Sequence, residues 1–213
     1  MTGARGNREE LLDAHRSLQE TYNASAQAYD EQRAKFLFEQ AWLDRFLASL
    51  PNQPTVLDVG CGSSEPISAY LVSKGCSLTG IDFATAMLAI ARSRYPAHSW
   101  LEADMRKLAL GKTFHGVLSW DAFFHLTRDE QRQTIPRLAD HVATSGSLML
   151  TIGPEDGEEM GKVDGKPVYH ASLSQQEYKE ILRTAGFENV ELTLEDPDCD
   201  YHCVVLATNK KPK

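Results

Sequence analysis

Two glycines and two aspartates carry the clearest chemical signal in this sequence. The apolar run Val56–Val59 ends in Gly60-Cys61-Gly62, and glycines at such a turn let a ligand approach the backbone closely. Asp82 is the twentieth residue after Gly62, and an acid at this spacing can accept hydrogen bonds from both hydroxyls of a ribose. Asp104 ends the next apolar run and could accept a hydrogen bond from an adenine amino group. The alternatives are an acidic helix cap at Asp82 and a surface turn at Asp104.

Several side chains near these acids could take part in chemistry. Phe83 and Met105 directly follow the two aspartates, and they either sandwich an adenine face or belong to the core. His125 lies five residues after Trp120, and its usual pKa suits removal of a proton near neutral pH. A histidine that caps the helix predicted from Thr127 is the alternative.

Three more candidates lie toward the C-terminus: Tyr169, His170 and His202. The histidines are far apart in sequence and lack the spacing of metal ligands, so no metal site is predicted. They either line one acceptor pocket or lie on the surface. The four cysteines form no C-x-x-C pair, and we interpret them as reduced thiols in a cytoplasmic protein.

Composition narrows the classes of partner. The net charge of -8 disfavours binding to nucleic acid or to an anionic membrane. Residues 1–10 are charged and lack an apolar segment, so we expect no signal peptide. No apolar run approaches the ~20 residues that a membrane span needs. The basic tail 210–213 is expected to be solvated.

The elements that must position these residues alternate along the chain from Thr55 onward. Strands are predicted over 55–59, 77–81, 98–102, 114–120, 147–152, 190–194 and 202–208. Helices are predicted between them over 66–74, 85–95, 127–142 and 174–186, two of them opened by capping boxes at Thr127 and Ser174. Pro136 should kink or restart its helix. The last two strands are joined by about seven residues and should pair antiparallel.

This order predicts a doubly wound α/β fold: a Rossmann-like seven-stranded sheet, mostly parallel with an antiparallel last strand, and helices on both faces. Residues 1–50 form an N-terminal helical region with a soft break at 23–25, and 51–213 form the ligand-binding domain. The N-terminal helices either pack on the core or form a lid over the site. Residues 153–172 form a variable insertion with a small hairpin at Asp164-Gly165.

The sequence resembles the class I S-adenosylmethionine-dependent methyltransferases that act on small molecules. Residues 56–62 resemble their glycine-rich first motif, Asp82 the acid of the second, and Asp104 that of the third. Residues 119–126 stand where their strand-four motif borders the substrate, and 29–33 resemble their lid helix. The sequence departs from the pattern at Ser63-Ser64-Glu65, where a third glycine is usual.

The resemblance implies S-adenosylmethionine as cofactor and methyl transfer to an O or N atom of a small-molecule acceptor. It implies cofactor contacts from the lid helix, the glycine turn and three strand ends: Tyr29, Arg33, Asp58, Gly60, Cys61, Gly62, Asp82, Phe83, Met87, Asp104, Met105, Ser119 and Trp120. His125 and Asp121 are the catalytic candidates, as base and as acceptor-orienting group. The acceptor pocket is assigned to five aromatic side chains: Tyr22, Phe124, Tyr169, His170 and His202.

The sequence is compatible with two other functions. A nicotinamide-dependent oxidoreductase shares the glycine turn and the acid, but G-x-G-x-x-G lacks its last glycine here, since that position is Glu65. A protein that binds the cofactor without chemistry is the other alternative.

Overall fold

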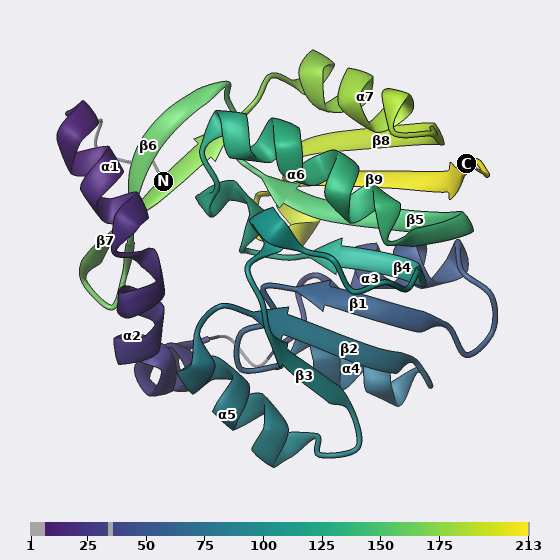
Figure 1. Cartoon of the computed structure of the whole chain (residues 1–213), viewed down its shortest axis with the longest axis horizontal. Helices are drawn as coiled ribbons and strands as arrows, with labels where there is room; N and C mark the ends of the chain where they lie inside the picture. The colour runs from purple at the N-terminus through teal and green to yellow at the C-terminus, as the bar shows by residue number, and fades with distance from the viewer. Residues whose placement is uncertain (1–6, 34–35, 213) are drawn as a thin grey trace.

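The centre of the fold is a seven-stranded sheet in the order β3-β2-β1-β4-β5-β9-β8 (Figure 1). The computed structural model describes residues 7–33 and 36–212. The strands of this sheet are β1 Thr55–Val59, β2 Ser77–Asp82, β3 Ser99–Glu102, β4 Phe114–Ser119, β5 Val142–Ile152, β8 Phe187–Asp196 and β9 His202–Lys210. The first five are parallel, and β9 lies antiparallel between β5 and β8. The predicted fold class, including the antiparallel end, is confirmed.

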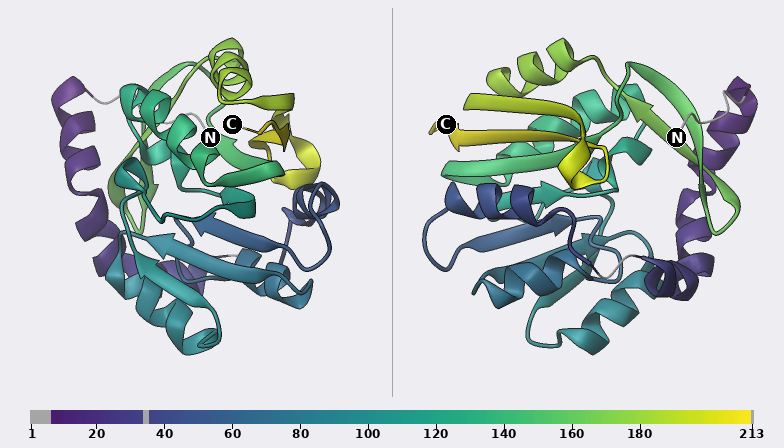
Figure 2. Two further views of the ribbon diagram at one scale, coloured as in Figure 1. Left: turned by 45° about the vertical axis from the view of Figure 1, so that its right-hand side comes forward. Right: turned by 180° about the vertical axis from the view of Figure 1, so that it is seen from behind.

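Helices cover both faces of this sheet. They are α1 Arg8–Arg16, α2 Leu18–Gln32, α3 Gln40–Ala48, α4 Ile67–Ser73, α5 Thr85–Arg94, α6 Arg128–Asp140 and α7 Gln175–Thr184, with 3₁₀ turns η1 Met105–Lys107, η2 Phe123–His125 and η3 Pro197–Cys199. The helices α3, α4 and α5 pack on one face, and α6 and α7 pack on the other (Figure 2). A membrane-spanning helix is not found in the part of the chain that the structure describes.

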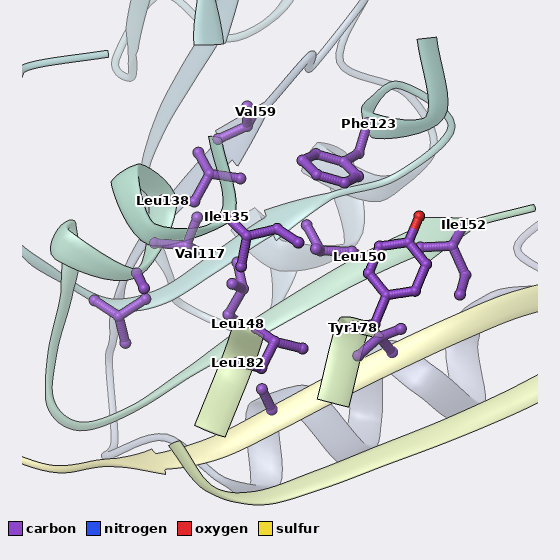
Figure 3. Packing of buried hydrophobic residues seen from close by; sticks show 14 of the residues in the cluster. Val59, Val117, Phe123, Ile135, Leu138, Leu148, Leu150, Ile152, Tyr178 and Leu182 are labelled. Carbon is purple, nitrogen blue, oxygen red and sulfur yellow. The ribbon is translucent and has the colours of Figure 1, made fainter. Parts of the chain in front are cut away.

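The core under α6 and α7 shows what holds this face together. Val117 and Leu150 from the sheet contact Ile135 from α6 and Leu182 from α7, and all four are fully buried (Figure 3). Each such side chain contributes about 1.5–3 kcal/mol relative to an exposed position. Buried Tyr178 donates a hydrogen bond to Gln131 Oε1 at 2.5 Å, so its hydroxyl is satisfied inside the apolar cluster.

The N-terminal helices differ from the sequence prediction. The soft break expected at 23–25 is wrong, because α2 runs through it; the helix begins after Ser17 and ends at Gln32. Asn23 does not compete with its own helix backbone, since its Oδ1 accepts hydrogen bonds from Ala86 N and Thr85 Oγ1 at the start of α5. Part of the predicted region 1–50, namely residues 1–6, 34 and 35, lies outside the described residues.

Two further helix predictions need correction. Pro136 does not restart α6, which is one helix, because Ile135, Leu138 and Ala139 on its buried face pack against the sheet. Ser174 accepts a hydrogen bond from Glu177 N, but the Glu177 carboxylate pairs with Arg132 instead of completing a capping box. The Thr127 capping box is confirmed.

The insertion and the N-terminal helices meet at one end of the sheet. The insertion forms a long hairpin, β6 Gly157–Val163 and β7 Lys166–Ser172, which confirms the predicted turn at Asp164-Gly165. In Figure 1, α1, α2 and this hairpin lie on the side toward which the arrows of β1 and β4 point. They therefore stand over the carboxyl ends of the parallel strands, where ligands bind in such sheets.

Candidate functional site

One pocket lies at this edge, between the strand ends and α2. It is lined by residues from the lid helices, the glycine turn and the ends of β2, β3 and β4: His15, Leu18, Tyr22, Tyr29, Arg33, Asp58, Gly60, Cys61, Gly62, Ser63, Ser64, Glu65, Ile67, Ile81, Asp82, Phe83, Met87, Ala103, Asp104, Met105, Arg106, Trp120, Asp121, Ala122, His125 and Leu126. Of the residues predicted for the cofactor, only Ser119 is not among them. Its buried hydroxyl donates to the Val59 carbonyl at 2.7 Å, beneath the turn.

The glycine turn is held by the main chain of the neighbouring strand. Gly60 N and Cys61 N both donate to Ile81 O, at 2.8 and 3.0 Å. Gly60 has a φ of +75°, and a Cβ built on it would lie 2.3 Å from the Cβ of Ala122. The absence of a side chain is therefore a packing requirement at this position.

Asp82 braces the same turn. Its Oδ2 accepts from Gly62 N at 2.9 Å, and its Oδ1 accepts from Ala84 N at 2.8 Å. Burial raises the pKa of Asp82 to about 6, although these backbone donors favour the charged form. Each carboxylate oxygen can accept more than one hydrogen bond, so both remain able to receive a ligand hydroxyl.

Asp58 is a second buried acid below the turn. Burial raises its pKa to about 7, against the hydrogen bond that Ser68 Oγ donates to Asp58 Oδ2 at 2.9 Å. Two adjacent acids with raised pKa values are typical of a functional site.

Three buried polar groups in the lining lack a hydrogen-bond partner among the described residues. They are the Ser63 and Ser64 hydroxyls and the indole Nε1–H of Trp120. Ser64, at the position where a third glycine is usual, has a φ of +77°. Unsatisfied buried donors around a pocket indicate that a polar ligand completes them.

Asp104 lies at the pocket but is engaged by its neighbour. Arg106 donates to it from Nε at 2.9 Å and reaches Glu130 at 2.9 Å with its other end. Partial burial raises the pKa of Asp104, yet the Arg106 guanidinium outweighs this and holds it below the ordinary value. Asp104 is thus a charged acceptor at the tip of β3, beside Met105.

The α2 helix is fastened across the pocket by polar contacts along its length. Gln19 Nε2 donates to Phe83 O at 2.7 Å, and Asn23 bonds the start of α5. Further along, Asp30 accepts from Arg94 at 2.6 Å, and the same guanidinium donates to Ser63 O at 3.1 Å. These contacts hold α2 beside the strand ends that line the pocket.

A charged cluster closes the end of the pocket near Trp120. Arg33 donates to Glu39 at 2.6 Å and lies 4.0 Å from Asp121. The Asp121 carboxylate is 3.0 Å from His202 Nε2, and the His202 ring stacks on Trp120 at 5.5 Å. Burial lowers the pKa of His202, but Asp121 more than compensates and raises it above its ordinary value.

His125 also lines the pocket and is paired through both ring nitrogens. Nε2 is 2.7 Å from the Tyr22 hydroxyl, and Nδ1 is 2.8 Å from the Tyr169 carbonyl oxygen. Phe124 and His170 pack around its ring, at 5.0 and 4.9 Å. Burial, with His170 nearby, lowers the pKa of His125 to about 3. Of the predicted acceptor residues, Tyr22 lines the pocket, while Phe124, Tyr169, His170 and His202 are not among its lining residues.

Sequence reasoning missed several lining residues, among them His15, Leu18, Arg106 and Ala122. His15 and Leu18 shared the helical spacing of Tyr22, and that stripe was the available signal. Ala122 belongs to the segment 119–126 that was expected to border the substrate, but its contact with Gly60 forms only in the folded chain. No group of three potential metal ligands occurs within residues 7–33 and 36–212.

Comparison with known proteins agrees with this geometry. The family model of the methyltransferase domain matches residues 56–146. The uncharacterized methyltransferase OB1106 of Oceanobacillus iheyensis is 24% identical over 199 residues, which cover 92% of this chain and 84% of that protein. YqeM of Bacillus subtilis is 36% identical over 90 residues, and that match covers 41% of this chain and 36% of that protein.

Among solved structures, CalS10 from Micromonospora echinaspora, an amino pentose methyltransferase with bound SAM, superposes with a TM-score of 0.68 and 23% identity. The match covers 86% of this chain and 96% of that one. The sheet order, the glycine turn and the domain match define a methyltransferase fold. Residues 56–146 match the methyltransferase domain, and the chain has the fold of the S-adenosylmethionine-dependent methyltransferases.

Proposed function

We propose that this chain binds S-adenosylmethionine in the pocket under α2 and transfers its methyl group to an O or N atom of a small-molecule acceptor. The observation that carries the proposal is the convergence of Gly60, Gly62, Asp82 and Asp104 on one pocket at the carboxyl ends of the parallel strands. CalS10, which shares the fold, acts on an amino pentose. A small acceptor and a cytoplasmic location are parts of the same proposal.

The lining fits the cofactor in three respects. Asp82 offers acceptor lone pairs to ribose hydroxyls, and Asp104 with Phe83 and Met105 offers an acceptor and apolar faces to adenine. Gly60 lines the pocket, and its lack of a Cβ lets the turn pack against Ala122. The buried hydroxyls of Ser63 and Ser64 still need polar partners.

The methionine part of the cofactor would lie near both positively and negatively charged side chains. Tyr29 and Arg33 come from α2 and its end, and Asp58 and Asp121 come from the strand side. An α-carboxylate suits Arg33, and an α-ammonium suits an acid. The aromatic face of Trp120 lines the pocket beyond Gly60, where a positive sulfonium is favoured.

When bound, the cofactor supplies a methyl group that is already activated. The chain therefore needs mainly to orient the acceptor and to exclude water. The helix α2, fastened by Gln19, Asn23 and Asp30, covers the site and limits the acceptor's size. The net charge of -8 supports a small-molecule acceptor over a nucleic acid.

Calorimetry of the purified full chain tests the binding step. We expect S-adenosylmethionine and S-adenosylhomocysteine to bind, and NADH not to bind. Absence of S-adenosylmethionine binding would refute the proposal, and NADH binding alone would favour the oxidoreductase. Mass spectrometry of methylated products from a set of small acceptors then separates an enzyme from a protein that only binds the cofactor.

A further inference from the structure

A directed chain of hydrogen bonds runs from the pocket wall into the hairpin. The Tyr169 carbonyl can only accept, so the His125 Nδ1 that lies 2.8 Å from it carries a hydrogen. A neutral imidazole then has a bare lone pair on Nε2, 2.7 Å from the Tyr22 hydroxyl. Tyr22 must therefore donate its hydrogen to His125. Its oxygen presents only lone pairs to the pocket.

The groups around His125 keep these hydrogen bonds directed from Tyr22 to His125 and from His125 to the Tyr169 carbonyl. His125 is buried, and the titratable groups near it are Tyr22 on α2, His15 on α1, His170 on β7 and Asp121. Burial and the two histidines disfavour a second proton on His125, and they outweigh the Asp121 carboxylate, which favours it. The His15 ring faces away from the imidazole, since its nitrogens contact the His125 carbonyl and Glu130.

A proton on both nitrogens of His125 is consequently costly. Burial and His170 lower the pKa of His125 to about 3, and burial raises the pKa of Tyr22 well above its ordinary value. Neither ring is a good sink for a proton taken from an acceptor. The pair can orient a hydrogen-bond donor, but it cannot ionise a hydroxyl.

Resting on the proposed function, we propose that the Tyr22 oxygen accepts a hydrogen bond from an N–H of the methyl acceptor, and that the acceptor atom is a neutral amine nitrogen rather than a hydroxyl oxygen. In this role Tyr22 touches the acceptor directly. His125 is a positioning residue that fixes the direction of the Tyr22 hydroxyl.

The chemistry balances without a base in the pocket. The nitrogen lone pair forms the new C–N bond, the C–S bond breaks, and its electron pair stays on the sulfur. The extra proton stays on the product nitrogen and leaves to water after release. A hydroxyl would need to lose its proton as the bond forms, and the Tyr22–His125 pair does not take it.

The first test needs no turnover. Nitrogen NMR of the full chain labelled at histidine, with S-adenosylhomocysteine bound, reports the tautomer of His125. We expect the Nδ1–H form from about pH 5 to pH 8, with Nε2 shifted as a hydrogen-bond acceptor, and loss of that shift in Tyr22→Phe. An Nε2–H tautomer, or protonation of His125 with a midpoint above about pH 6, overturns the proposal.

The second test compares matched acceptors, aniline with phenol and glucosamine with glucose, at high concentration and about pH 8. We expect methylation of at least one amine, at least 100-fold faster than of its hydroxyl partner. Tyr22→Phe should lower that rate at least tenfold with unchanged S-adenosylmethionine affinity, and the exposed Tyr201→Phe should not.

The results of these tests distinguish failure of the nitrogen-acceptor proposal from failure of the proposed function. Equal methylation of the hydroxyl partner, or cofactor binding with no amine methylated, rejects the nitrogen acceptor and leaves the cofactor site in place. Absence of S-adenosylmethionine binding rejects the proposed function itself.

Discussion

The two walls of the pocket are built by different means. The wall of the glycine turn is held through its own backbone N–H groups: Gly60 N donates to Ile81 O, and Gly62 N donates to the Asp82 side chain on the adjacent strand. The wall around His125 is held by side chains from distant segments, such as Tyr22, which lies 103 positions away in sequence. The first wall persists as long as the sheet does, whereas the second exists only while the N-terminal helices are docked.

Because of this difference, substitutions in the two walls should have different effects. A change at the turn acts on sheet geometry and on the proposed cofactor contacts together. A change at the contacts that hold α1 against η2 and α6 should leave the cofactor side nearly intact. Four variants test that division, from the largest expected effect to the smallest.

Gly60→Ala should be the most damaging change in the main-chain wall. Its Cβ would lie 2.3 Å from the Cβ of Ala122, and a φ of +75° adds about 1–2 kcal/mol of strain. We expect S-adenosylmethionine affinity to fall at least 100-fold, about 2.7 kcal/mol, by calorimetry. Gly62→Ala is the control, because its Cβ meets no described atom within 4 Å and only the strain remains. Equal losses in both variants would contradict the contact with Ala122.

Asp58→Asn tests the electrostatics of the same wall through pH. The unfolded chain loses this proton near pH 3.9, while burial raises the folded pKa to about 7. Between these values the native state binds more protons, so the wild-type free energy of unfolding falls as pH rises. Asn stays neutral and can still accept from Ser68.

Urea unfolding of the free protein measures this effect. The stability of Asp58→Asn relative to wild type should increase by about 2.6 kcal/mol from pH 5 to pH 8. The same relative stability at both pH values would show that Asp58 is charged throughout.

The same contrast explains what the sequence could predict. The turn and Asp82 could be predicted because residues close in sequence, or on the adjacent strand of a regular sheet, define them. The pairing of Tyr22 with His125 depends on where two helices dock. The spacing of residues along the sequence does not predict that position. The soft break at 23–25 was mispredicted for a related reason, since Asn23 bonds the start of α5 rather than its own backbone.

Asp82→Ala removes the brace between the turn and β2. The Gly62 and Ala84 N–H groups both lose their acceptor. We expect S-adenosylmethionine affinity to fall at least tenfold, about 1.4 kcal/mol, by calorimetry. Asp82→Asn should be intermediate, because its single amide oxygen can satisfy only part of the set. Unchanged affinity in Asp82→Ala would remove this residue from the site.

His15→Ala tests the side-chain wall and should have the smallest effect on the cofactor. The His15 ring joins α1 to the rest of the pocket, because its nitrogens lie 3.2 Å from the His125 carbonyl and 3.1 Å from Glu130. Both partners are acceptors, so the ring holds α1 to η2 and to the start of α6 together. Without it, amide hydrogens of α1 and of the first turns of α2 should exchange faster with solvent.

Cofactor affinity should change less than about threefold in His15→Ala, which is under about 0.7 kcal/mol. Arg16→Ala is the matched control, because Arg16 pairs only with its exposed neighbour Asp13 among the contacts of the described chain. If the loss of His15 lowered cofactor affinity as much as the loss of Asp82 does, the two walls would be one cooperative unit. If the two walls are independent, amide hydrogens should exchange faster only in the N-terminal helices, and exchange at the glycine turn should not change.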